Sequence, residues 1–176
     1  MHGIRGFRLE EFAFQRLDGL DQRMIGTSEK TDAWSGNSVK RFVVLKHEVG
    51  PCFERTTQTH LDWMFATGDA LATWSTELIM DFEHSFDTPC MRLADHRLVY
   101  LDREGDLGGG RGSVRRMLAG EYIPLASALG QMVFKAALRW HTERGVQHGT
   151  LEIVQRREET VSESEVALGL RFSRCR

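Results

Sequence analysis

Short apolar runs separated by glycine-containing turns recur along residues 41–155, and they constrain the fold more than any other feature of the sequence. The clearest example is residues 61–74, where Leu61–Ala66 and Ala70–Trp74 flank a turn at Gly68. Two such runs on either side of a glycine turn are typical of a β-hairpin. Residues 41–47 are rich in β-branched and aromatic side chains and too few for a free-standing helix, so they are also expected to form a strand.

The second half of this region continues the pattern. Gly112–Leu118 and Tyr122–Ile123 flank a short turn at residues 119–121, which predicts another hairpin. Along residues 132–140, apolar and charged side chains alternate, which favours a strand, although the alanines and leucine there leave a helix open. With Thr150–Gln155 as a further strand, the sequence predicts a mainly β protein, either a small antiparallel barrel or a sandwich.

The two ends of the chain differ from this central region. Residues 1–40 are mixed in character and are interpreted as an extension, with either a short amphipathic helix over residues 7–17 or little order. Residues 156–176 are highly charged and are predicted to form a solvated tail. The expected folded domain is therefore residues 41–155.

Composition narrows the class of protein. Hydrophobic residues make up 41% of the 176-residue chain and charged residues 27%, which are ordinary values for a globular protein. The net charge of −2 argues against non-specific coating of nucleic acid. Three scattered cysteines do not make a disulfide framework. No apolar run approaches the ~20 residues that span a bilayer. Acidic residues interrupt the N-terminal apolar stretch, which argues against a signal peptide. We therefore expect a cytoplasmic protein without a membrane partner.

Two histidines and an aspartate form a candidate metal site. His60 and Asp62 are two residues apart, so on a strand they point to the same face, while Leu61 and Trp63 point to the other. His47 ends the preceding expected strand and reaches the same place if the two strands pair. Two imidazoles and one carboxylate suit manganese, iron(II) or zinc, although an H-x-D triplet alone also arises often by chance.

A second polar cluster follows at Asp95–Gly105. His96 and Tyr100 offer donors for a phosphate oxygen, and arginines outnumber acidic residues around them. A solvated charged loop is the alternative interpretation. The glycine-rich stretch Gly108–Gly112 lacks the lysine and the helix of a P-loop, so it is expected to be a turn.

Four short motifs occur in a fixed order along residues 41–155. They are Phe42–Glu48, His60–Phe65, Asp95–Gly105 with its histidine and tyrosine, and the run from Gly112 to Tyr122. In this order they resemble the 3′-phosphoesterase domain found at the N-terminus of bacterial DNA ligase D and in its free-standing relatives. The ordered set is much more specific than any one of its motifs.

This resemblance implies a small β-barrel with a few flanking helices and a divalent metal, usually manganese. It implies a hydrolase of DNA repair that removes a 3′-phosphate or a 3′-ribonucleotide from a primer end. His47, His60 and Asp62 would then be the metal ligands, while His96 and Tyr100 would hold the phosphate and act in catalysis. The implied partners are a nucleic-acid 3′ end and a ligase or polymerase of end joining.

The chain departs from the family pattern in the phosphate-binding residues. Members of the family have an arginine where this chain has Met64, and the lysine that usually follows the tryptophan is absent after Trp74. Arg55, on the loop before His60, is expected to supply the missing cation. The further substrate-binding candidates are Arg92 and Arg97. On this interpretation, an arginine at position 64 should raise activity.

Two alternatives remain open from the sequence. The first is a non-catalytic relative that binds DNA ends or a repair partner. The second is an Fe(II)/2-oxoglutarate oxygenase, in which His60 and Asp62 would pair with His148 and Arg156 would hold the co-substrate. The oxygenase alternative leaves His47 and the His96–Tyr100 motif unexplained.

Overall fold

The computed structural model describes residues 34, 39–126, 132–156 and 167–175 of the chain. The chain divides into two compact units, residues 1–36 and residues 37–176, and every strand of the described residues belongs to the second unit. The extension expected over residues 1–40 lies almost wholly outside the described residues. Among the described residues, no helix is long and apolar enough to cross a membrane.

Nine strands and one 3₁₀ turn make up the described part of the chain. They are β1 (Lys40–Val49), β2 (His60–Ala66), β3 (Ala70–Glu77), β4 (Phe86–Arg97), η1 (Leu98–Leu101), β5 (Gly105–Asp106), β6 (Gly112–Pro124), β7 (Met132–Thr142), β8 (Gly145–Arg156) and β9 (Ala167–Arg174).

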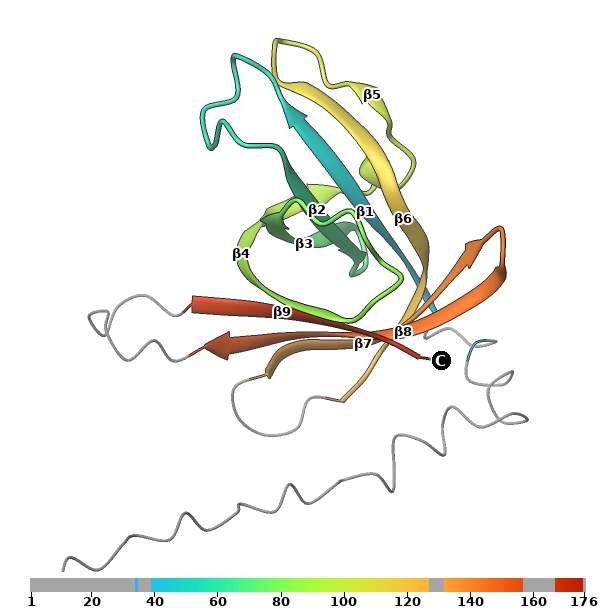
Figure 1. Cartoon of the computed structure of the whole chain (residues 1–176). Helices are drawn as coiled ribbons and strands as arrows, with labels where there is room; N and C mark the ends of the chain where they lie inside the picture. The colour runs from blue at the N-terminus through green and yellow to red at the C-terminus, as the bar shows by residue number, and fades with distance from the viewer. Residues whose placement is uncertain (1–33, 35–38, 127–131, 157–166, 176) are drawn as a thin grey trace, which may run out of the picture. The chain divides into compact units, whose positions relative to one another are not determined.

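Eight of these strands close into an antiparallel β-barrel (Figure 1). Their order is β1-β2-β3-β4-β9-β8-β7-β6, and β6 pairs back onto β1 to complete the ring. The short strand β5 adds to β6 outside this ring. The prediction of a small antiparallel barrel is confirmed. The flanking helices are not found in the described ranges, where η1 is the single helical element.

Alternation along the strands separates two apolar clusters. Phe42 and Val44 of β1 belong to the larger one, whereas Val43 and Leu45 belong to a smaller one. The larger cluster receives side chains from every barrel strand and is therefore the barrel interior. Its largest fully buried members include Phe42, Trp63, Phe65, Tyr122, Trp140 and Phe172. The smaller cluster lies on the opposite, outer face of β1, β2 and β3, beneath η1 and Leu107.

The hairpin predicted within residues 112–123 is wrong, because β6 runs unbroken through this segment. Gly120 pairs with Phe42 on one side and Trp140 on the other, so it sits in the middle of the sheet. A Cβ atom at Gly120 would lie 2.1 Å from the carbonyl oxygen of Arg139. The glycine therefore permits a close approach of two backbones rather than a turn.

The predicted solvated tail at residues 156–176 is wrong for residues 167–174, which form β9. This strand pairs with β4 and β8, and without it the ring would be open. Leu170 and Phe172 point into the barrel, while Arg171 between them is exposed. The charged Arg171 therefore belongs to the outward face of a barrel strand, not to a tail.

We expect Phe172→Ala to lower the free energy of unfolding by about 3 kcal/mol, because it leaves a cavity in a close-packed core. The Phe172 ring stacks on Phe86 at 5.1 Å between centroids and lies 5.8 Å from Trp140. Urea unfolding measures the change. The neighbouring substitution Arg171→Ala, on the outer face, should cost less than about 1 kcal/mol. Equal effects at the two positions would contradict the assignment of β9 to the core.

Candidate metal centre

The site lies on the outer face of the barrel, where β1 and β2 pair. His47 is directly opposite His60 in the β1–β2 register, and Asp62 is two residues further along β2. Leu61, between the two β2 ligands, points into the barrel as the alternation predicts. The structure thus brings together the three side chains that the sequence singled out as metal ligands, and all three are buried.

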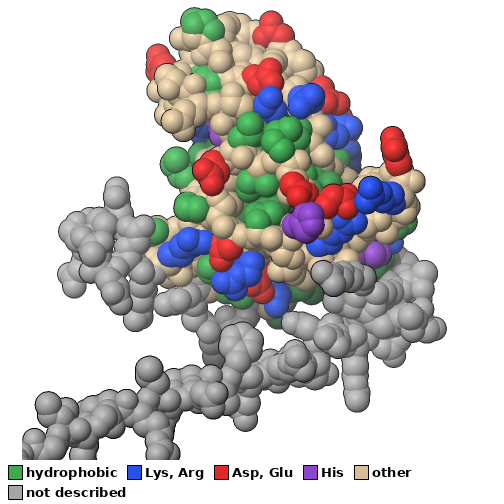
Figure 2. Space-filling model, in the orientation of Figure 1, with side chains coloured by type: hydrophobic (Ala, Val, Ile, Leu, Met, Phe, Trp, Pro, Cys, Tyr) green, Lys and Arg blue, Asp and Glu red, His purple; other side chains and the backbone are tan. Residues whose placement is uncertain are grey.

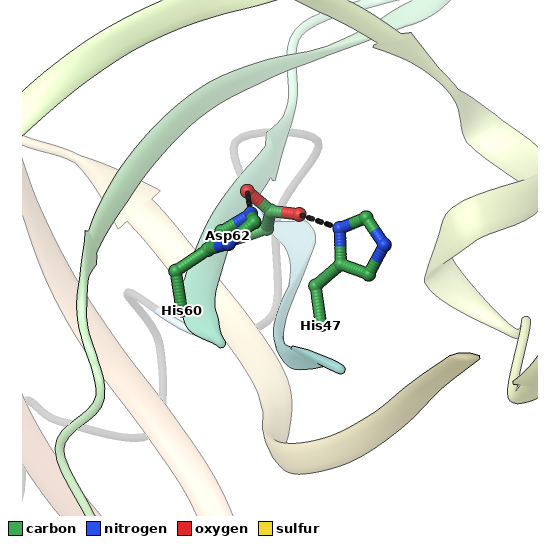
Figure 3. A group of neighbouring side chains, drawn as sticks. All are labelled: His47, His60 and Asp62. Atoms are coloured by element: carbon green, nitrogen blue, oxygen red, sulfur yellow. Dashed lines mark ion pairs between the residues drawn. The ribbon is translucent and has the colours of Figure 1, made fainter. Parts of the chain in front are cut away.

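The ligand atoms of these side chains converge on one point (Figure 3). The carboxylate of Asp62 lies between the two imidazoles, with Oδ2 3.9 Å from Nδ1 of His47 and Oδ1 3.6 Å from Nε2 of His60. One ligand atom from each residue lies within 4.8 Å of the others. These separations are too long for hydrogen bonds. Atoms bound at ~2 Å to one ion lie roughly 3 Å apart, so the three side chains would draw together slightly to share it.

Backbone carbonyls fix the orientation of both imidazoles. Nδ1 of His60 donates to the carbonyl oxygen of Gln58 at 2.9 Å, and Nε2 of His47 donates to that of Arg111 at 3.0 Å. Because a carbonyl only accepts, the protons are on these outer nitrogens, and each neutral ring turns a lone pair toward Asp62. Histidines that bind metals are held in the same way by their second nitrogen.

Asp62 is the electrostatically unsatisfied member of the site. Its Oδ1 is buried and makes no hydrogen bond within the described part of the chain. Burial raises the pKa of this carboxyl, and the electrostatic influence of nearby basic side chains only partly opposes the rise. Burial also lowers the pKa of His47, which favours the neutral ring that binds metal. A cation between the three side chains would compensate the buried carboxylate, so the donor set fits a divalent metal.

Two loops cover the site and hold its ligands. The Phe53 ring packs edge-on against His47 with 4.6 Å between centroids, and the Arg55 guanidinium lies 5.1 Å from the centre of that ring. The amide of Cys52 donates to the carbonyl of Gly110 at 2.9 Å, next to the Arg111 carbonyl that orients His47. The stretch Gly108–Gly112 therefore supports the carbonyl that orients His47. Nothing in the sequence identified Phe53 as a cover for the histidines.

The structure places His96 and Tyr100 on the same side of the barrel. Their rings meet edge-to-face at 5.4 Å between centroids, and Nδ1 of His96 donates to the carbonyl of Ala94 at 2.9 Å. His96 is opposite Leu71 of the outer apolar cluster in the β3–β4 register, so the two motifs predicted separately lie on the same outer face of the barrel. Tyr100 lies within η1, which follows β4 directly.

A groove of about 340 Å³ opens beside His60 and runs over β3 and β4. Arg55 lines it, whereas Arg92 and Arg97 are not among its lining residues. The Arg92 guanidinium lies 5.0 Å from the centre of the Trp74 ring and donates to the carbonyl of Thr73 at 3.0 Å. Of the three arginines expected to bind substrate, the structure therefore places Arg55 in the groove.

Met64 continues the row of Asp62 on β2, but it is packed in the outer apolar cluster. Its side chain is 1% exposed among the apolar residues of that cluster. Those residues are Val43, Leu45, Leu71, Leu101, Leu107 and Val114. An arginine at this position would be packed mainly among apolar side chains. This environment argues against the expectation that it would restore a phosphate contact.

The oxygenase alternative is contradicted by the topology. His148 lies on β8, which is four strands away from β2 in either direction around the barrel. It therefore cannot complete a site with His60 and Asp62. Arg156, assigned to the co-substrate, pairs with Asp87 instead.

No protein-family model matches the sequence, and a search of curated proteins finds no significant match. The arguments that follow therefore depend on the geometry of the site.

We expect Asp62→Asn to stabilise the metal-free protein by about 1 kcal/mol while removing stabilisation by metal. The amide removes a buried charge, and its NH₂ can donate to a histidine lone pair that faces only acceptors in the native site. Urea unfolding with a chelator and with Mn²⁺ tests both parts. A variant less stable than the native protein in chelator would contradict the orientation of the two lone pairs.

Proposed function

We propose that the chain is a metal-dependent phosphoesterase that trims nucleic-acid 3′ ends, removing a 3′-phosphate or a 3′-ribonucleotide. The observation that carries the proposal is the convergence of two histidine lone pairs on the carboxylate of Asp62, beside a groove that His60 lines. The buried Oδ1 of this carboxylate makes no hydrogen bond with the described residues. The ordered motifs of the ligase D phosphoesterase domain supply the substrate class and favour manganese as the ion. Repair of DNA ends, with a ligase or polymerase nearby, follows from the same resemblance.

Different residues of the site would perform different steps of such a reaction. An ion held by His47, His60 and Asp62 would polarise a phosphoryl oxygen and lower the pKa of a bound water. Arg55 lines the groove beside His60, where its guanidinium can pair with a phosphate. His96 and Tyr100, in contact with one another, can donate to the phosphoryl oxygens as negative charge develops or protonate the leaving oxygen.

A labelled primer–template ending in one 3′-ribonucleotide tests the proposal, alongside the same duplex ending in a 3′-phosphate. We expect removal of the terminal group with Mn²⁺, none with chelator, and none by Asp62→Asn. Retention of both ends by the native protein with manganese, magnesium or zinc would overturn a catalytic role.

The burial of Met64 favours a second candidate, a non-catalytic protein that binds nucleic-acid ends. Met64 provides no donor to a phosphate, and a charged transition-state contact is typically worth ~3 kcal/mol. The same duplexes distinguish the two candidates. Metal-dependent binding of the 3′ end without cleavage would support the second.

A further inference from the structure

Glu77 is the nearest strand neighbour of the site on the side of the groove. It is directly opposite His60 in the β2–β3 register, and directly opposed side chains share a face with Cβ atoms ~5 Å apart. His47, His60 and Glu77 therefore form one row across β1, β2 and β3. The carboxylate lines the groove and accepts a hydrogen bond from the Thr88 hydroxyl at 3.5 Å.

The groove carries opposite charges and an apolar wall. Arg55 and Glu77 are its two charged lining residues, and the β4 side contributes Pro89, Met91 and Leu93. Its volume of about 340 Å³ is at the small end of ligand-binding pockets. These features suit a ligand with one phosphate near Arg55 and a compact organic group along the apolar wall.

The surface over β8 and β9, beside β4, offers little support for an extended polyanion. Arg156 and Arg171 both pair with Asp87, and Arg174 pairs with Glu83. On the face viewed in Figure 2, basic and acidic side chains lie next to one another rather than in separate patches. A nucleic-acid chain that left the groove past Glu77 toward β9 would thus meet arginines already paired with acids.

We propose that Glu77 determines the specificity of the groove, which takes a phosphoester bearing a single phosphate on a compact organic group with hydrogen-bond donors. Its carboxylate accepts from a hydroxyl or amino group of the substrate and repels a second phosphate at that place. The inference rests on the proposed phosphoesterase function and restricts its substrate to a terminal or free nucleotide with no second phosphate inside the groove. Coulomb repulsion between charges a few ångströms apart at a partly exposed site changes affinity by about fivefold.

The test compares two ligands, a nucleoside 3′-monophosphate and the matching nucleoside 3′,5′-bisphosphate, by calorimetric binding to the full chain with Mn²⁺. The native protein should bind the monophosphate at least about fivefold more tightly. Glu77→Gln keeps an acceptor but removes the charge, so it should bring the two affinities together by tightening the bisphosphate. In 1 M salt the native preference should shrink, because screening weakens the repulsion.

Asp69→Asn is the matched control, since Asp69 is an exposed acid in the turn at the other end of the β2–β3 hairpin. It makes the same change of charge and should leave the preference unaltered. If the monophosphate binds but Glu77→Gln does not change the ratio, or Asp69→Asn changes it equally, the role of Glu77 is wrong and the phosphoesterase proposal stands. If neither ligand binds the native protein with Mn²⁺, both proposals fall together.

Discussion

Replacing His60 with alanine should lower the affinity for Mn²⁺ by at least about 100-fold. Even the hydrogen-bond partners of metal ligands typically contribute 10- to 100-fold to affinity, so loss of a direct ligand should cost more. The expected size follows from the small donor set, because only His47, His60 and Asp62 meet the geometric requirement among the described residues. Competition with a fluorescent chelator measures the affinity, and the metal-induced rise in melting temperature gives an independent readout.

His84→Ala is the control for this substitution. His84 is an exposed histidine that pairs with Asp81 outside the site, so its loss removes an imidazole without touching the candidate ligands. We expect the native Mn²⁺ affinity in this variant. If His60→Ala keeps the native affinity, the convergence of the three side chains serves another purpose and the proposed chemistry loses its basis.

The grouping of the three candidate ligands could be predicted because their arrangement depends on local geometry. The period of two along a strand puts His60 and Asp62 on one face whatever the rest of the fold, and pairing with the preceding strand brings in His47. The groups that orient them could not be predicted. The carbonyls of Gln58 and Arg111 belong to loops, and their positions depend on how those loops pack.

The errors in the fold predicted from the sequence have a related cause. The sequence around β9 is dominated by charge, yet Leu170 and Phe172 alternate with outward polar residues and fill the barrel. The glycine in β6 resembles a turn signal, but whether a glycine turns the chain or lets another strand approach depends on a partner distant in sequence. Local patterns therefore predicted strands and their faces, while barrel closure depended on pairings that no local pattern encodes.

Met64→Arg should lower the free energy of unfolding by about 5 kcal/mol, rather than raise activity. Met64 is fully enclosed in the outer apolar cluster, with Thr73 opposite it on β3 and Asp62 two residues away along β2. A guanidinium there would lose its hydration among apolar side chains, and the one carboxylate in its row is Asp62 of the candidate metal site. An incompletely compensated buried charge typically costs about 3–5 kcal/mol. The loss of methionine packing adds to this cost. Urea unfolding in chelator measures the change without the contribution of a metal.

Met80→Arg makes the same substitution at a side chain that is 59% exposed, and it should change the stability by less than about 0.5 kcal/mol. The difference between the two variants matters for function, because Met64 is next to Asp62 in the outward-facing row of β2 and belongs to the apolar cluster. If Met64→Arg is as stable as the native protein and gains phosphoesterase activity, the segment from η1 to β6 must open to admit a phosphate. The outer cluster would then be a movable cover and the groove beside His60 a secondary feature of the site.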